Sequence, residues 1–316
     1  YASYGVMLCG ILGNIDAGYQ FGKLALDLLE KFQAKELKAR TFMVFNNFIR
    51  HWKEHVREGL PSLIEAYQSG LDTGDIEFAA YCGFIYCYHS YFVGKELTAL
   101  AQEMETYLQA SDRLKQETAS HLLQLYRQSV ANLLETTENP CFFSGKYYDE
   151  NKMLSLLLAV NHKTALFHLY CQKLTLNYLF EAYDRATENA LQAKKYIDGV
   201  IASLSLPIFN FYHSLTLIST YSSTSIWQKK RILKLVKMNQ RQMRKWADSA
   251  PMNHLHKYYL VEAESHRVLG DFVRAIDDYD RAIALAQKHT YLQEEALANE
   301  LAAKFYLELG KDTIAR

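Results

Sequence analysis

The chain has 316 residues, of which 49 % are hydrophobic, so it is long enough for one large domain or two ordinary ones with an extended core. Glycine (14) and proline (4) are scarce, which argues against turn-rich all-β folds and indicates a mostly helical protein. Lys and Arg together number 35, as do Asp and Glu, so no global charge draws the chain to nucleic acid or to a membrane surface.

The five cysteines are odd in number and scattered through apolar segments, at Cys9, Cys82, Cys87, Cys141 and Cys171. Such a pattern predicts buried free thiols in a reducing compartment, and hence a cytoplasmic protein. No basic segment followed by a hydrophobic stretch and a cleavage site is visible, so no signal peptide is predicted.

Two helical segments near the N-terminus look like faint copies of one repeat. They are GKLALDLLEKF, which starts at Gly22, and EGLPSLIEAYQ, which starts at Glu58. Their glycines, Gly22 and Gly59, would then hold equivalent places in neighbouring helical hairpins.

Between these segments, His51, Glu54 and His55 match the pattern H-x-x-E-H. On a helix, this spacing puts two imidazoles one turn apart to bind zinc, with the glutamate as a general base. The pattern is short, and no distinctive motif downstream supplies a third ligand. A zinc hydrolase is therefore only a remote alternative, and we expect ordinary residues on a helix surface.

The segment AAYCGFIYCYHSYF, residues 79–92, is apolar nearly all round a helix. Cys82, Cys87 and His89 lie within it, but their spacing is not that of a zinc finger, so we predict that they fill a core. The clearest break in the helical pattern follows at residues 138–151, ENPCFFSGKYYDEN, which we predict to be a long loop inside one solenoid, with a boundary between two domains as the lesser possibility. Ser144-Gly145-Lys146 in this loop lacks the rest of a phosphate-binding motif.

Residues 199–228 contain no charged residue at all. Their apolar residues never run close to the ~20 needed to span a bilayer. We therefore predict a buried helix pair, broken near Pro207, and no membrane insertion.

The next helix carries a basic stripe, by which we mean Lys230, Lys234, Lys237, Arg241 and Arg244. These residues recur at helical spacing, opposite an apolar face. The stripe could bind an acidic partner, anionic lipid or nucleic acid. We favour a solvated face that balances the acidic residues of the helices directly after it, namely Glu262, Glu264, Asp277 and Asp278.

The C-terminal part, residues 253–316, contains the clearest repeats. Gly270 and Asp271 predict a tight turn, because glycine can end one helix in the left-handed conformation and aspartate can cap the next. The nearby aspartates then mostly face water, and their spacing is not that of a calcium loop. The pattern recurs 40 residues later at Leu309-Gly310-Lys311, with Ala315 where Ala275 stood. A fixed period of this length is typical of helical-hairpin solenoids.

This repeat resembles the tetratricopeptide repeat, whose small, glycine and aromatic positions match Ala263, Gly270, Phe272, Ala275, Tyr279 and Ala282. A fainter copy of the second helix occurs at Tyr183, Ala186, Ala190 and Ala193. The resemblance implies a concave groove that binds a peptide or a partner domain. Its matching positions here are Lys257, Leu260, Glu264, Arg267, Glu300, Lys304, His168, Thr175 and Tyr178.

A broader resemblance rests on residues 161–220, on HKYYLVEAESHRVLGDFVRAIDDYDRAIALA and on EEALANELAAKFYLELG. These segments look like the helical-repeat region of large bacterial, especially cyanobacterial, signalling proteins. In that family a Ser/Thr kinase domain and an AAA-type ATPase precede the repeats, and a GAF domain and a histidine kinase follow them. The motifs of those enzymes are absent here, so no enzymatic activity is expected of this chain.

Together these patterns predict an all-α protein, a tetratricopeptide-like solenoid of αα hairpins in a right-handed superhelix spanning residues 1–316. We expect a non-catalytic relay module of a sensor kinase that binds a neighbouring domain, a peptide or an effector. The alternative is a free-standing adaptor for protein partners. No cofactor, metal or nucleic acid is expected.

Overall fold

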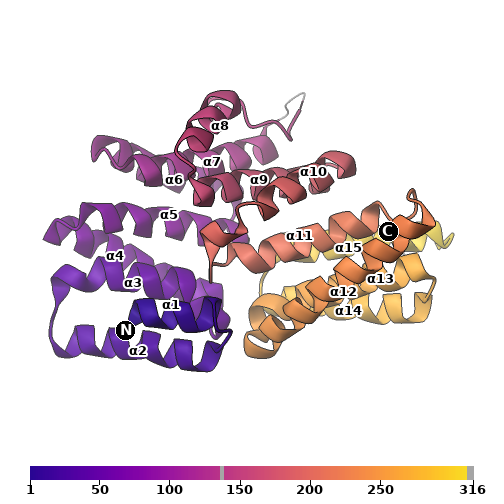
Figure 1. Ribbon diagram of the computed structural model, residues 1–316, viewed down its shortest axis with the longest axis horizontal. Helices are drawn as coiled ribbons and strands as arrows, with labels where there is room; N and C mark the ends of the chain where they lie inside the picture. Colours follow the sequence, from indigo (N-terminus) through magenta and orange to yellow (C-terminus); the bar gives the residue numbers. More distant parts are fainter. Residues whose placement is uncertain (136–138, 312–316) are drawn as a thin grey trace. The chain divides into compact units, whose positions relative to one another are not determined.

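The computed structural model describes residues 1–135 and 139–311, and these form α-helices, four short 3-10 helices and no β-strand (Figure 1). The all-α class is therefore confirmed. The helices are α1 (Ala2–Gly10), α2 (Ile15–Lys31), α3 (Lys38–Phe48), α4 (Leu60–Thr73), α5 (Ile76–Phe92), α6 (Leu97–Arg113), α7 (Glu117–Leu134), α8 (Glu150–Ala159), α9 (Lys163–Leu179), α10 (Tyr183–Lys194), α11 (Ser205–Ser219), α12 (Ile226–Ser249), α13 (Pro251–Leu269), α14 (Phe272–Lys288) and α15 (Leu292–Glu308). The 3-10 helices are η1 (Lys35–Leu37), η2 (Arg50–Trp52), η3 (Val56–Gly59) and η4 (Ile197–Val200).

The chain divides into two compact units, Tyr1–Leu206 and Pro207–Arg316. We expected a helix break near Pro207, but this residue is the third of α11. Proline fits there because the first turn of a helix does not need its missing N–H. The predicted loop, described from residue 139 onward, joins α7 to α8 inside the first unit. A single solenoid over the whole chain stays a prediction.

In the first unit, the helices α3, α5, α7 and α9 pack one on the next as a row, which we call the inner row (Figure 1). Even-numbered helices, such as α4, α6 and α10, pack against its members. Most residues of α5, α7 and α9 in this row are buried, whereas most of α3 is partly exposed. In α5, every residue from Ala79 to Phe92 except Tyr81 is buried, which explains an apolar pattern all round this helix. The prediction that Cys82, Cys87 and His89 fill the core is confirmed.

Most helix connections contain a residue in the left-handed backbone conformation. Such residues stand at positions 13, 33, 74, 94, 115, 161, 181, 202, 270, 290 and 310. Within the runs 74–115, 161–202 and 270–310, successive positions are 20 or 21 residues apart. Each interval holds one helix and its turn, so a pair of helices occupies about 40 residues, which is the length of a helical-hairpin repeat.

The turn between α13 and α14 follows its predicted chemistry. Gly270 has φ 78°, and the Asp271 side chain accepts a hydrogen bond from the Arg274 amide at 3.4 Å. Asp277 is exposed as expected, but Asp278 is buried and binds Nδ1 of His266 at 2.9 Å. Gly310 also has a positive φ, 71°, while Ala315 lies outside the described residues.

The fainter repeats differ in outcome. Ala186, Ala190 and Ala193 of α10 are buried, as are Ala275 and Ala282 of α14. The predicted equivalence of Gly22 and Gly59 is wrong. Gly22 lies in the middle of α2, where an added Cβ would meet Phe45, whereas Gly59 is the last residue of η3.

No helix within residues 1–135 and 139–311 has both the length and the apolar character needed to cross a bilayer. The five cysteines are free and buried, as predicted from their surroundings.

Candidate functional site

The H-x-x-E-H segment does not form the helix that a zinc signature requires. His51 lies in η2 and is buried, with Nε2 2.9 Å from the carbonyl oxygen of Ala202. Glu54 forms an ion pair with Arg50 at 2.6 Å, and His55 caps η3 through Nδ1. In the described parts of the chain, no three His, Cys, Asp or Glu side chains lie close enough to share a metal ion. The helical premise of the zinc alternative is therefore wrong.

The predicted groove residues of α13 are mostly buried. Lys257 is 4 % exposed, and its Nζ lies 2.9 Å from Glu294 of α15 and 3.0 Å from the carbonyl oxygen of Asn253. His256 reaches the same carboxylate at 2.7 Å. Burial acts to raise the pKa of Glu294, but the interactions with Lys257 and His256 lower it by more and hold this pKa below its ordinary value. Lys257 thus ties α13 to α15 and does not face an open groove.

A second buried network includes Glu264, whose carboxylate receives two hydrogen bonds from Arg267 at 2.8 and 3.1 Å. It also accepts a hydrogen bond from the Tyr279 hydroxyl. Arg267 reaches on to Glu308 of α15 at 3.2 Å. Leu260, on the same helix, is 2 % exposed. These side chains also join helices within the second unit.

The remaining predicted groove residues lie on two other helices. On α15, Glu300 and Lys304 are at the surface and pair with each other at 2.6 Å. On α9, in the first unit, Thr175 and Tyr178 are buried, and the Thr175 hydroxyl donates to the helix backbone at 3.0 Å. His168, also on α9, lines a cavity described below. The expectation that all these residues face one open groove is corrected, because most of them fill contacts between helices.

The basic stripe on α12 is exposed at all five positions. Arg244 pairs with Asp248 at 3.0 Å, but Lys230, Lys234, Lys237 and Arg241 have no acidic side chain within 4.0 Å among the described residues. Three of the four expected acidic neighbours are engaged elsewhere: Glu264 binds Arg267, Asp278 binds His266 and Arg281, and Glu262 accepts from Gln240, while Asp277 is exposed. The stripe is therefore not neutralised by ion pairs with them.

A groove of about 680 Å³ runs beside the stripe, between α12 and α13. Lys237, Arg241 and Arg244 line it together with one acidic residue, Glu262, and with apolar side chains, among them Leu233 and Leu269. The second unit therefore offers cationic groups directly beside apolar surface.

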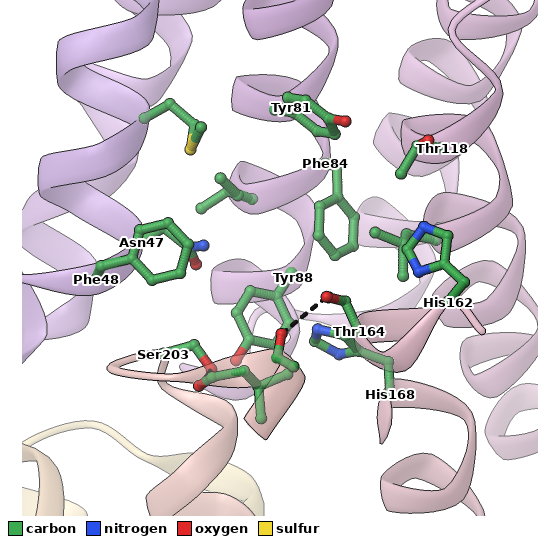
Figure 2. A pocket seen from close by; sticks show the side chains of 15 residues that line it. Asn47, Phe48, Tyr81, Phe84, Tyr88, Thr118, His162, Thr164, His168 and Ser203 are labelled. Atoms are coloured by element: carbon green, nitrogen blue, oxygen red, sulfur yellow. Dashed lines mark hydrogen bonds between the residues drawn. The ribbon is translucent and has the colours of Figure 1, made fainter. Parts of the chain in front are cut away.

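A separate cavity of about 320 Å³ lies among the helices of the inner row (Figure 2). The lining comes from α3, α5, α7, from α9 with its N-cap, and from η4 with the segment after it: Met43, Asn47, Phe48, Tyr81, Phe84, Ile85, Tyr88, Thr118, Leu122, His162, Thr164, His168, Gly199, Val200 and Ser203. None of these is an Asp, Glu, Lys or Arg. The volume is at the lower end of the range of small-molecule sites.

Hydrogen bonds fix the polar groups at one end of this cavity. The Thr164 hydroxyl donates to the carbonyl oxygen of Gly199 at 2.8 Å, the contact dashed in Figure 2. The hydroxyls of Tyr88 and Ser205 are 2.7 Å apart, and that of Tyr126 lies 2.8 Å from His168 Nδ1. Burial lowers the pKa of His168 to about 3, so its imidazole is neutral at physiological pH.

Sequence reasoning missed this cavity as a site. The apolar pattern of residues 79–92 predicts a helix that fills a core, and Tyr81, Phe84 and Tyr88 do belong to a mostly buried helix. A spacing that puts residues on one face of α5 does not reveal that α3, α7 and α9 leave a space in front of it.

Comparisons with known proteins give one partial similarity. No protein-family model matches the chain, and no solved structure matches it. A segment of 141 residues, 44 % of this chain, is 23 % identical to Hybrid signal transduction histidine kinase G of Dictyostelium discoideum. The match covers 4 % of that protein, so the chain corresponds to a small part of its length.

Proposed function

We propose that the chain is a non-catalytic helical-repeat module that relays signals in a larger signal-transduction protein. It does so by docking an acidic amphipathic segment of a partner or of a neighbouring domain along the basic stripe of α12. The partial similarity to a signal transduction histidine kinase supports the signalling context. The 20- or 21-residue spacing of the left-handed turns supports a tetratricopeptide-like repeat.

The observation that carries the docking proposal is the state of the basic stripe. Lys230, Lys234, Lys237 and Arg241 are exposed, and no described acidic residue pairs with them. Repulsion among these neighbouring cations disfavours the free state, and a negatively charged partner relieves it.

The apolar side chains beside the stripe favour a protein segment over a purely ionic ligand. An amphipathic helix can place Leu or Ile side chains in the groove against Leu233 and Leu269 while its acidic residues meet Lys237 and Arg241. Signal relay then requires that the partner bind one docking state better than another.

A binding assay tests this function. A fluorescent amphipathic peptide of Leu, Ala and Glu is titrated with the chain, and its anisotropy is recorded at low and at high salt. We expect the triple variant Lys230→Glu, Lys234→Glu, Lys237→Glu to weaken binding about tenfold or more, equivalent to ~1.4 kcal/mol.

The matched control is Lys31→Glu, Lys115→Glu, Lys194→Glu, which makes the same change of net charge at exposed lysines of the first unit. It should leave the affinity unchanged. Equal losses in both variants would reject a docking stripe. Tighter binding of single-stranded DNA or of phosphatidylserine vesicles than of the peptide would assign the stripe to a different partner class.

A further inference from the structure

The cavity of the inner row combines features that close packing alone does not explain. Its volume, about 320 Å³, is roughly ten times the ~30 Å³ share of one water molecule in the liquid. Asn47, Tyr81 and Thr118 on its wall are partly exposed, so the space opens to solvent and a ligand can enter it. The space is bounded by four helices that hold one another in place.

The lining is apolar with a few polar groups at defined positions, as in sites for small molecules. Phe48, Tyr81, Phe84 and Tyr88 supply aromatic surface from α3 and α5. Asn47 and Thr118 lie on opposite sides of the space in Figure 2 and add an amide and a hydroxyl.

His168 is the one lining histidine that is almost fully buried, at 5 % exposed. Burial holds the pKa of Tyr126 well above its ordinary value, so this residue remains a phenol. Its hydroxyl lies 2.8 Å from His168 Nδ1, and we assign the donor role in this contact to the phenol. A neutral imidazole that accepts at Nδ1 carries its proton on Nε2. His168 therefore offers an N–H donor to the cavity that it lines.

We propose that this cavity binds an uncharged, largely apolar small molecule with a ring system and one hydrogen-bond acceptor, which accepts from Nε2–H of His168. The absence of Lys and Arg from the lining disfavours phosphate and carboxylate ligands, because a buried charge without a partner is costly. The aromatic side chains favour a flat, ring-bearing body. This inference does not depend on the docking stripe, which belongs to the second unit.

Two probes of nearly equal shape test the chemistry on the unmodified chain. 2-Acetylnaphthalene is neutral and carries a carbonyl acceptor, whereas 2-naphthoate is an anion at neutral pH. Binding is measured by isothermal titration calorimetry, and contacts are located by NMR as intermolecular nuclear Overhauser effects to the ring protons of Tyr81, Phe84 and His168. We expect the ketone to bind at least tenfold more tightly than the naphthoate, with effects to those rings.

Two variants place the probe in the cavity. Thr118→Phe fills part of the space and should weaken ketone binding at least tenfold. Thr106→Phe adds the same ring at an exposed position of α6 and should change nothing. His168→Leu keeps the apolar wall but removes the donor, so the affinity should fall by about threefold to tenfold. Circular dichroism checks that each variant is folded.

Three results would overturn the proposal. They are no ketone binding at millimolar concentration, equal binding of the ketone and the naphthoate, and unchanged affinity in a folded Thr118→Phe variant. If Thr118→Phe does not fold, the two-probe comparison and the NMR contacts on the unmodified chain still decide the question.

Discussion

Lys257 and Glu294 illustrate how a charge can be kept inside this protein. Both side chains are at most 5 % exposed and lie 2.9 Å apart. Burial lowers the pKa of Lys257, while Glu294 acts to raise it. The attraction between the two ions offsets the free-energy cost of removing them from water. Asn253 and His256 add further hydrogen bonds to the pair.

A double-mutant cycle tests this interpretation. Lys257→Met leaves a buried carboxylate without its main counter-ion, so we expect a loss of about 3–5 kcal/mol in the free energy of unfolding. The double variant Lys257→Met, Glu294→Leu removes both charges and should recover most of that loss. Urea unfolding measures both. A double variant as unstable as the single one would mean that packing, and not the charge, holds Lys257 in place.

At the scale of helices and turns, the left-handed conformation of certain turn residues should affect the stability of the fold. Lys115 joins α6 to α7 with φ 54°, a conformation that costs a residue with a Cβ roughly 1–2 kcal/mol. Gly74 joins α4 to α5 with φ 81°, and an added Cβ there would meet nothing within 4 Å.

We therefore expect opposite effects at the two turns. Lys115→Gly should raise the free energy of unfolding by about 0.5–1 kcal/mol, because glycine relieves the strain but gains freedom in the unfolded chain. Gly74→Ala should lower it by about 1 kcal/mol. Thermal unfolding followed by circular dichroism provides the measurement. A fall in stability for Lys115→Gly would show that its turn is held by something other than backbone conformation.

These turns also explain how much of the fold was predictable. Gly270 was recognised because glycine is a strong signal for a left-handed helix end. Gln33, Lys115 and Glu181 adopt the same conformation but carry no such signal, so the regular spacing of the turns stayed hidden in the sequence. Helical character was readable throughout because it depends on local periodicity.

The candidate sites were less predictable for a related reason. A repeat alignment assigns Lys257 to a helix face but does not say which residue of the next helix pair lies opposite. Glu294, which forms the buried ion pair with Lys257, is on α15. The cavity likewise depends on side chains from four helices that are far apart in the sequence. The basic stripe was found in full because all five residues lie on one helix.

At the scale of the whole chain, buried histidines should make stability depend strongly on pH. Burial lowers the pKa of His51 and His256 to about 4 and that of His89 and His168 to about 3. The folded protein keeps these rings neutral, while the unfolded chain binds protons near the ordinary histidine pKa of about 6.5. Stability is therefore complete above about pH 6.5 and is lost as the pH falls toward the folded-state values.

Each of the four rings contributes a slope of up to about 1.4 kcal/mol per pH unit in this window. Urea unfolding between about pH 7.5 and about pH 5 measures the total slope.

His89 allows a single ring to be isolated, because neither of its nitrogens has a hydrogen-bond partner among the described residues. His89→Leu should keep the stability at neutral pH, because it replaces an unsatisfied buried polar group with an apolar one. It should also lower the slope by the contribution of one ring, up to about 1.4 kcal/mol per pH unit. Tyr91→Phe, on the same helix, changes a group whose pKa burial raises and should leave the slope unaltered. An unchanged slope in His89→Leu would mean that this ring is protonated in the folded protein, and that the inner row admits water that its packing is expected to exclude.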